Sequence, residues 1–382
     1  MKKNILYSSK VFFTAIIAAC CFSACDNAEY DVINNQIFIT QAMSNPTTKL
    51  VVDPDNGANG TFTISLSDKS GQDITARLTA SEAALNAYNI SNGTNYHMLP
   101  ADGFSFSQDE VTIEAGSTLS SAVEIHVNPF TQEQIESGEL YAIPIAVESV
   151  SSDFSTQSNL SNYIVLLDKV IVTSVPILNG RNKTVPINPM PSFNFSEWSL
   201  EFRMNMSHYA INNQAIFGAY PDEIYIRFGD AGKPNNMLQI KTQGTQYESG
   251  YDFKDGEWYH IAFVANSSSL SIYINGTLDG TMPLSGSAKW TINELSLIGS
   301  GTQYFPSDCM LSEFRLWSKA ISQSQIQNYM FAINPETLGL EAYWKMNEGE
   351  GNRFNDSSKN GIHLQANGTV RWKDGIRSDG KE

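Results

Sequence analysis

Alternation of apolar and polar side chains with a period of two is the property of this sequence that most restricts its fold. It is clearest in residues 61–66 (TFTISL), 123–127 (VEIHV) and 270–274 (LSIYI). Successive side chains of a strand point to opposite faces, so each segment is expected to bury one face and expose the other. Only 17% of the residues are charged and 41% are hydrophobic, which favours a β-rich secreted protein over a helical bundle. The predicted fold class is all-β.

Residues 32–168 are expected to form the first β-domain. Short alternating segments are separated by turn residues, and their number favours an immunoglobulin-like sandwich. Ser81 and Thr131 are placed as N-caps of two short helices. Pro144 interrupts an apolar run and lacks an N–H group, so its strand is expected at a sheet edge or a bulge.

The same region resembles a known family. The matching segments are residues 96–100 (YHMLP), 104–106 (FSF), 111–113 (VTI) and 141–147 (YAIPIAV). They resemble a domain of unknown function (DUF1735) that often follows the lipid anchor in surface proteins of gut Bacteroidetes. The resemblance implies a spacer or platform role, with no catalytic residues to carry over.

Residues 169–378 are expected to form a second, larger β-domain. Residues 258–264 (WYHIAFV) lead into residues 270–276 (LSIYING), which end in the Asn-Gly signal of a tight hairpin. With residues 311–317 (LSEFRLW) and 343–351 (YWKMNEGEG), they resemble the laminin-G-like, concanavalin A-like jelly-roll family. In many relatives the last of these elements opens the domain, so here we expect a permuted order in which the late strands complete the same sandwich.

The N-terminus has the pattern of a secretory signal. Met1-Lys2-Lys3 precedes a short apolar run, and Phe22-Ser23-Ala24 precedes Cys25. The pattern resembles a bacterial lipoprotein signal, which implies removal of residues 1–24 and lipidation of Cys25. Residues 25–31 would then be an acidic tether, and the protein an outer-membrane lipoprotein of the cell envelope, exposed at the surface. An ordinary cleaved signal is the alternative.

Charge excludes one class of partner. The chain has 24 Lys and Arg against 40 Asp and Glu, a formal net charge of −16. A basic stripe of the kind that nucleic acids require is therefore not expected. The expected partners are a glycan or polysaccharide and, through the lipid anchor, the membrane; an outer-membrane transporter or a host protein could be a further partner.

The sequence offers little sign of catalysis, so we do not expect an enzyme. A retaining glycosidase needs two carboxyl groups about 5–5.5 Å apart, and no alternating carboxylate pattern on a strand provides them. Glu348 and Glu350 have suitable spacing but flank a glycine in a loop-like run. The five histidines are scattered, and no nucleophile or phosphate-loop motif is present.

Candidate ligand-binding residues come from predicted loops and their surroundings, because binding groups concentrate in loops on rigid scaffolds. Aromatic faces can stack on sugars, and carboxylates can bind hydroxyl groups. The candidates are Tyr247, Tyr251, Trp290, Tyr304 and Asp308. For each aromatic residue, packing on the edge of the sandwich is the alternative.

A calcium site is considered at Asn355 and Asp356, because Ca²⁺ takes six to eight oxygen ligands. An Asx-turn, in which the side chains bond the local backbone, would explain the same residues. Residues 53–57 (DPDNG) lack the spacing of a calcium loop and are expected to form a solvated turn.

Together these observations predict a lipid-anchored surface protein that binds carbohydrate through its second domain. The first alternative is an adhesion or protein-interaction module, and the second is a glycoside hydrolase. Exposed aromatic residues over one concavity would favour glycan, a flat apolar patch would favour protein, and two close carboxylates would favour hydrolysis.

Overall fold

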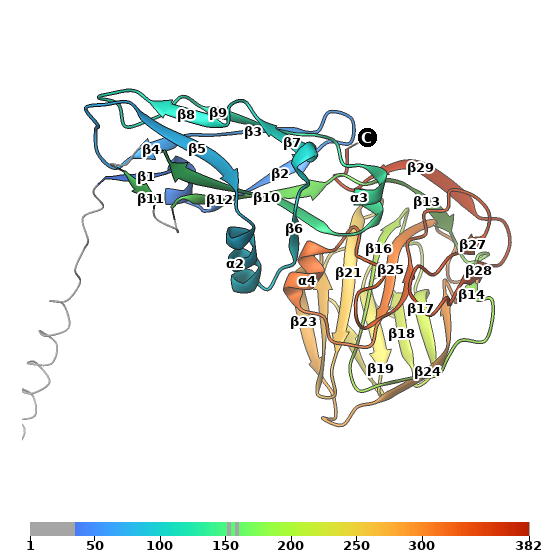
Figure 1. The fold of residues 1–382 in the computed structure, drawn as a ribbon. Helices are drawn as coiled ribbons and strands as arrows, with labels where there is room; N and C mark the ends of the chain where they lie inside the picture. Colours follow the sequence, from blue (N-terminus) through green and yellow to red (C-terminus); the bar gives the residue numbers. More distant parts are fainter. Residues whose placement is uncertain (1–34, 151–153, 157–159, 382) are drawn as a thin grey trace, which may run out of the picture.

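The structure is a computed structural model that describes residues 35–150, 154–156 and 160–381, which form two β-domains (Figure 1). The predicted signal peptide, Cys25 and the acidic tether lie outside these residues. Within the described ranges, no helix is long and apolar enough to cross a membrane. Strands dominate both domains, so the all-β prediction is confirmed.

The N-terminal domain is built on a six-stranded sheet in the order β2-β12-β10-β5-β8, with β6 against β10. Its strands are β2 (Thr47–Val52), β5 (Ile74–Ala80), β6 (Tyr96–Met98), β8 (Glu110–Ile113), β10 (Leu140–Ser149) and β12 (Asn162–Lys169). Two three-stranded sheets, β11-β1-β4 and β3-β9-β7, complete the domain. Their strands are β1 (Gln36–Ile39), β3 (Ala58–Phe62), β4 (Ile64–Leu66), β7 (Phe104–Phe106), β9 (Val123–Val127) and β11 (Ser155–Thr156).

Two short α-helices interrupt these strands where caps were predicted. The Ser81 hydroxyl accepts a hydrogen bond from the Ala84 N–H and starts α2 (Glu82–Asn92), which is longer than expected. Thr131 and Gln134 form a reciprocal capping box at the start of α3 (Gln132–Glu136). The 3₁₀ turns are η1 (Thr40–Met43) and η2 (Ala101–Gly103).

Pro144 corrects one prediction, because β10 is a central strand. The strand pairs with β12 on one side, and on the other it pairs first with β6 and then with β5. The carbonyl of Pro144 accepts from Ser81 on that second side, so its nitrogen faces the place where the neighbouring strand changes. A missing N–H costs little there, since no ladder partner is opposite.

The C-terminal domain consists of two packed sheets. The eight-stranded sheet has the order β23-β22-β21-β16-β25-β13-β29, with β26 against β25. Its strands are β13 (Val172–Leu178), β16 (Trp198–Met206), β21 (Trp258–Ala265), β22 (Ser269–Ile274), β23 (Thr277–Pro283), β25 (Cys309–Trp317), β26 (Leu340–Trp344) and β29 (Arg371–Arg377). One helix, α4 (Gln323–Asn328), follows β25.

The nine-stranded sheet has the order β20-β19-β18-β17-β24-β14-β28-β27, with β15 against β24. Its strands are β14 (Thr184–Pro186), β15 (Phe193–Phe195), β17 (Gln214–Pro221), β18 (Ile224–Phe228), β19 (Leu238–Thr242), β20 (Thr245–Glu248), β24 (Trp290–Leu297), β27 (Arg353–Phe354) and β28 (Leu364–Ala366). The late strands join both sheets: β26 and β29 enter the first, and β27 and β28 enter the second. This confirms that they complete the sandwich, as the permuted order predicted.

The core of this domain lies between the two sheets, and strand alternation determines which side chains enter it. Leu200, Phe202 and Met204 of β16 point into the core. The ring of Phe202 stacks on that of Phe314, with centroids 4.8 Å apart. Glu201 and Arg203 are the intervening residues, so they point to the outer face of the eight-stranded sheet.

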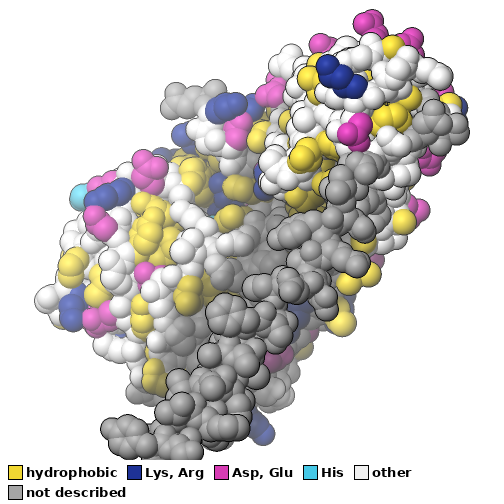
Figure 2. All heavy atoms as spheres, turned by 90° about the vertical axis from the view of Figure 1, so that its left-hand side faces the viewer, with side chains coloured by type: hydrophobic (Ala, Val, Ile, Leu, Met, Phe, Trp, Pro, Cys, Tyr) yellow, Lys and Arg dark blue, Asp and Glu magenta, His cyan; other side chains and the backbone are white. Residues whose placement is uncertain are grey.

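The surface carries charges of both signs despite the acidic composition. On the face drawn in Figure 2, acidic and basic side chains are interspersed with hydrophobic ones over both domains. Some form exposed ion pairs, such as Lys49 with Asp168 and Arg77 with Glu110, each at 3.0 Å. Exposed pairs of this kind contribute little to stability.

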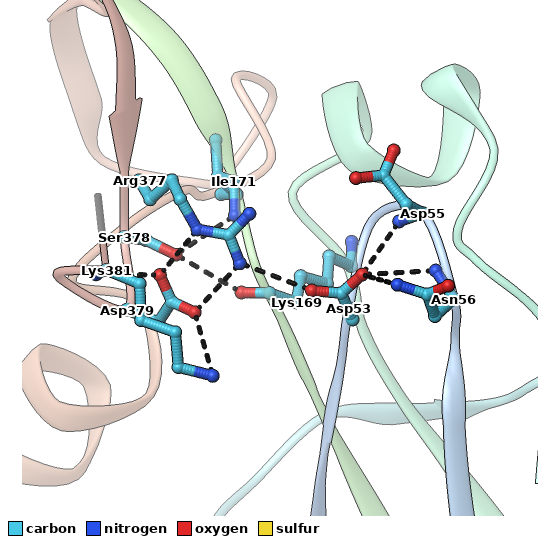
Figure 3. A network of polar contacts seen from close by, with 9 residues as sticks. All are labelled: Asp53, Asp55, Asn56, Lys169, Ile171, Arg377, Ser378, Asp379 and Lys381. Carbon is cyan, nitrogen blue, oxygen red and sulfur yellow. Dashed lines mark hydrogen bonds and ion pairs between the residues drawn. The ribbon is translucent and has the colours of Figure 1, made fainter.

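Polar contacts connect the end of β29 to the link between the domains (Figure 3). Arg377 donates to Asp379 and to Asp53 of the N-terminal domain. The Ser378 hydroxyl accepts from the Ile171 N–H at 3.0 Å. Asp53 also accepts from the backbone N–H groups of Asp55 and Asn56, so residues 53–57 form the predicted turn.

Candidate functional site

The two outer faces of the C-terminal sandwich differ in accessibility. On the eight-stranded sheet, α4 and its neighbouring loop cover Trp317 and Tyr343 in an apolar cluster. Glu201, His260 and Arg315 are buried on the same face. The outer face of the nine-stranded sheet instead carries exposed side chains, among them Tyr220 and Glu294. This second face is therefore the better candidate for binding a large ligand.

Two tyrosines form the centre of that face. In β17, Phe217 points into the core, and Gly218 and Tyr220 point outwards. Tyr225 of β18 pairs with Gly218. A side chain at position 218 would begin 3.6 Å from the Tyr225 ring and 3.7 Å from the Tyr220 ring. The two rings therefore border the space above Gly218, and Tyr220 is 43% exposed.

A hollow of about 370 Å³ adjoins Tyr220. One wall is the loop after β14, where Pro189 and the exposed Ile187 lie. The other wall is β24, which contributes Glu294 and Ser296. Aromatic and apolar walls with a few hydrogen-bonding groups are typical of ligand sites, and the volume lies within their usual range of roughly 300–1,000 Å³.

A polar network beside the tyrosines holds the face in one arrangement. Arg227 is buried and donates to Gln239 at 2.8 Å and to Asn213 at 2.9 Å. It also pairs with Asp230 at 2.7 Å. The Tyr225 hydroxyl donates to the same Asn213 oxygen at 2.9 Å. Because Asn213 bonds both side chains, the orientation of the Tyr225 ring is fixed before any ligand binds.

Two carboxylates of this network lie close enough to test for hydrolysis. The Gln239 amide donates to Asp230 at 3.0 Å and to Glu248 at 3.3 Å. Asp230 is paired with Arg227, and Glu248 with Lys233 at 2.8 Å. The Gln239 hydrogen bond and Arg227 hold the pKa of Asp230 below its usual value. A general acid of a glycosidase needs a raised pKa, so these contacts indicate a structural pair.

The structure places the two tyrosines predicted near residue 250 in different surroundings. Tyr247 is half-buried on β20, and its hydroxyl donates to Asp279 at 3.2 Å. Tyr251 is partly exposed, and its ring contacts those of Phe253 and Tyr259. Tyr247 therefore packs on the sandwich edge, whereas Tyr251 keeps an accessible ring.

The structure contradicts the prediction that Trp290 binds a ligand. It is fully buried in the core, where its indole N–H donates to Thr242 at 2.8 Å and its ring meets Trp198 edge-on. It cannot offer a face to a ligand, because both the ring and the polar atom are occupied inside the domain.

Tyr304 and Asp308 lie in the loop before β25. Tyr304 is half-buried, and its N–H donates to the Gly301 carbonyl. Asp308 pairs with Arg371 at 2.5 Å and accepts from Asn179 at 3.2 Å. Burial opposes ionisation of Asp308, but these partners hold the pKa of its carboxyl below the usual value. Within the described ranges, no hydrogen bond, ion pair or ring contact joins two of the five predicted ligand residues.

The calcium site at Asn355 and Asp356 is also corrected. The Asp356 carboxylate accepts from the N–H groups of Tyr343, Ser358 and Ile362. It also accepts from the Ser358 hydroxyl. These donors need the lone pairs that a cation would take, so the Asx-turn alternative is the observed one. Of the residues described, no group of three or more His, Cys, Asp or Glu side chains is placed to hold a metal ion.

The prediction from sequence missed Tyr220 and Tyr225, although a signal for one of them exists. Tyr225 lies between the buried Ile224 and Ile226, so its outward direction could be inferred. Tyr220 follows a continuous buried run in β17, which gives no such signal. The choice of this sheet over the other could not be inferred, because it depends on where α4 and the N-terminal domain pack.

Two family models match the chain, one for each domain. The model of an N-terminal domain family matches residues 33–153. The model of the concanavalin A-like lectin/glucanases superfamily matches residues 179–327. The second domain is therefore a concanavalin A-like domain, as its resemblance predicted. No curated protein matches the chain.

Among solved structures, that of a proposed carbohydrate-binding protein from Bacteroides ovatus ATCC 8483 is similar over both domains. The match covers 89% of this chain and 97% of that chain, with 21% sequence identity and a TM-score of 0.59. At this identity the similarity concerns the fold. More distant is the SAP-like pentraxin of Limulus polyphemus, at 15% identity over 52% of this chain and 95% of that chain, with a TM-score of 0.36.

Proposed function

We propose that this protein binds glycans on the outer face of the nine-stranded sheet, and that it acts without catalysis. The observation that carries the proposal is the pair of tyrosine rings bordering the space above Gly218, beside a hollow of about 370 Å³. Sugar rings present C–H faces that stack on aromatic rings, while Glu294 and Ser296 supply hydrogen-bonding groups for hydroxyls. The protein of Bacteroides ovatus with the same two-domain fold, itself a proposed carbohydrate binder, supports this assignment.

Affinity gel electrophoresis in soluble polysaccharides tests the proposal. Xylan, pectin, mannan and β-glucan serve as probes, and retardation of the wild-type protein by at least one is expected. The variant Y220A should weaken binding by up to about tenfold, which is the scale of one aromatic contact. The double variant Y220A/Y225A should remove retardation.

The matched control is Y251A, since Tyr251 has a similar exposure and lies outside the tyrosine pair. It should be retarded like the wild type. If Y251A loses binding and Y220A keeps it, the site lies in the loop around Tyr251 and the proposed face is wrong. A wild-type protein that no polysaccharide or glycan array retains would contradict glycan binding and favour a protein partner.

We also propose that lipidated Cys25 holds the protein in the outer membrane, with the N-terminal domain as a spacer. The support is the signal-like sequence before Cys25 and the order along the sequence, in which the N-terminal domain comes between that cysteine and the proposed site. Replacement of Cys25 by Ala should release the protein from the membrane fraction. Retention of that variant would overturn the anchor.

A further inference from the structure

A second cavity, of about 340 Å³, lies between the domains. Its roof comes from the N-terminal domain, with Gln132 and Ile135 of α3. Its floor is the outer face of the eight-stranded sheet, where Arg203 of β16 and Ser312 of β25 line it. Figure 1 shows α3 beside these strands at the junction of the domains. The cavity is distinct from the proposed glycan site at Tyr220 and Tyr225, which lies on the nine-stranded sheet.

Arg203 is unusual because it is a buried charge without an acceptor. Its side chain is only 7% exposed. The guanidinium carbon lies 4.9 Å from the centre of the Trp258 ring and 4.5 Å from that of Phe331. No hydrogen bond or ion pair connects it to another described residue. Aromatic rings stabilise a guanidinium through their faces, and the charge of the nearby Glu313 carboxylate favours the cation. The Arg203 nitrogens are not among the fully enclosed unpaired atoms, so they keep access to the cavity.

Ser312 supplies a second unused polar group at the same place. It pairs directly with Arg203 across the two strands, so both side chains project from the same face. Ser312 is 2% exposed, and its hydroxyl has no hydrogen-bond partner among the described residues. A buried hydroxyl that is left unpaired costs about 1–3 kcal/mol, so the pair implies an absent partner.

The carboxylates that line the cavity are already engaged. Glu313 adopts a left-handed backbone conformation with a φ of 55° at a bulge in β25. Its carboxylate accepts from Arg315 and from the Tyr343 hydroxyl. Glu136 accepts from Gln132 at 2.7 Å. Lys345 also lines the cavity and adds a second cation.

We propose that this cavity binds a small hydroxylated carboxylate, the chemistry of a single sugar-acid unit. The carboxylate would lie against the Arg203 guanidinium, which matches its planar, two-oxygen geometry. The Ser312 hydroxyl and the Gln132 amide would bond the ligand hydroxyls. The volume fits one small ligand, and enclosure between the domains favours a free unit or a chain end over the interior of a polymer.

Isothermal titration of the full-length chain without its leader tests the proposal, with D-glucuronate as the probe. D-glucose is the matched uncharged probe, and acetate tests the carboxylate alone. We expect saturable binding of glucuronate, weaker binding of acetate and none of glucose. R203Q should weaken glucuronate binding tenfold or more, whereas R181Q, which changes an exposed arginine outside the cavity, should bind like the wild type.

Two further variants keep the outcome decisive. If R203Q does not fold, S312A removes only a hydroxyl and should still weaken glucuronate binding severalfold. Y220A should leave glucuronate binding unchanged, so failure of the glycan proposal and failure of this one are distinguishable. Absence of glucuronate binding by the wild type, equal binding of glucose, or wild-type affinity in both R203Q and S312A would overturn the proposal.

Discussion

At the residue scale, the most constrained side chain is Glu201, which organises a buried charge cluster. One of its oxygens accepts from Arg315 at 3.2 Å and from the Trp317 indole at 3.1 Å. The other lies 3.2 Å from His260 Nε2. Burial opposes ionisation of Glu201, yet Arg315 and His260 hold the pKa of its carboxyl below the usual value. The cluster lies beneath the covering loops, which indicates a structural role.

Replacement of Glu201 by Ala should therefore destabilise the protein strongly. The buried Arg315 would keep Glu313 as its only carboxylate partner, and the Trp317 indole N–H would lose its acceptor. Breaking a buried pair in this way costs up to about 3–5 kcal/mol. The control is E110A, which breaks the half-exposed pair with Arg77 and should cost at most about 1 kcal/mol. Urea unfolding measures both free energies, and a loss in E201A no larger than in E110A would contradict this account.

At the element scale, the end of β29 is the segment whose contacts depend on charge. Arg377 bonds Asp379 at 3.0 Å and reaches Asp53 at 3.3 Å (Figure 3). The hydrogen bond from Arg377 holds the pKa of Asp379 below its usual value of 3.8. A lowered pKa means that the folded state prefers the ionised carboxylate. Its contribution is complete above pH 3.8 and is lost as the pH falls through the lowered value.

The variant D379N tests whether the ionised Asp379 carboxylate stabilises the folded state. It should be less stable than the wild type at pH 7, because the charged partner of Arg377 is missing. The difference between the two proteins should be smaller at pH 2 than at pH 7, because protonation of Asp379 in the wild type becomes more favourable as the pH falls. Comparing urea midpoints at both pH values cancels the titration of other carboxylates. An equal difference at pH 7 and pH 2 would show that the ion pair does not stabilise β29.

Some structural elements could be predicted from the sequence and others could not. The strands were predictable, because alternation in β16 and β22 is a local property of the chain. Caps were predictable for the same reason, as Ser81 and Thr131 show. Whether an aromatic side chain is buried or exposed was not predictable. The sequence around Trp290 would be the same whether its face of the strand were covered or open to solvent.

The candidate site was less predictable than the strands because it depends on distant contacts. Tyr225 can be assigned to an outward face from its neighbours, whereas Tyr220 cannot. Their face stays open only because α4 and α3 lie against the opposite sheet. Those contacts join residues far apart in the chain, so a local pattern carries no information about them. The unpaired Arg203 is hidden from sequence for the same reason.

At the scale of the whole molecule, side-chain and backbone contacts join the two domains. Asn334 of the C-terminal domain donates to Glu139 of the N-terminal domain at 2.7 Å. Beside them, Gly138 has a φ of 68°, and a side chain there would lie 2.1 Å from the Ile333 backbone carbon. The contact therefore requires a glycine both for its conformation and for its lack of a side chain.

The variant G138A should separate the domains, and Gly93 offers a matched control. Gly93 has a φ of 62°, and a side chain there would meet nothing within 4 Å. Both alanines pay the same left-handed backbone cost of about 1–2 kcal/mol, but only G138A also forces its loop away from Ile333. We expect a larger radius of gyration by X-ray scattering and faster proteolysis near residue 170 for G138A than for G93A. Because the sugar-acid cavity has walls from both domains, G138A should also lose glucuronate binding while it keeps retardation by polysaccharide. Similar scattering and similar cleavage of the two variants would mean that the domains are not held together at Gly138.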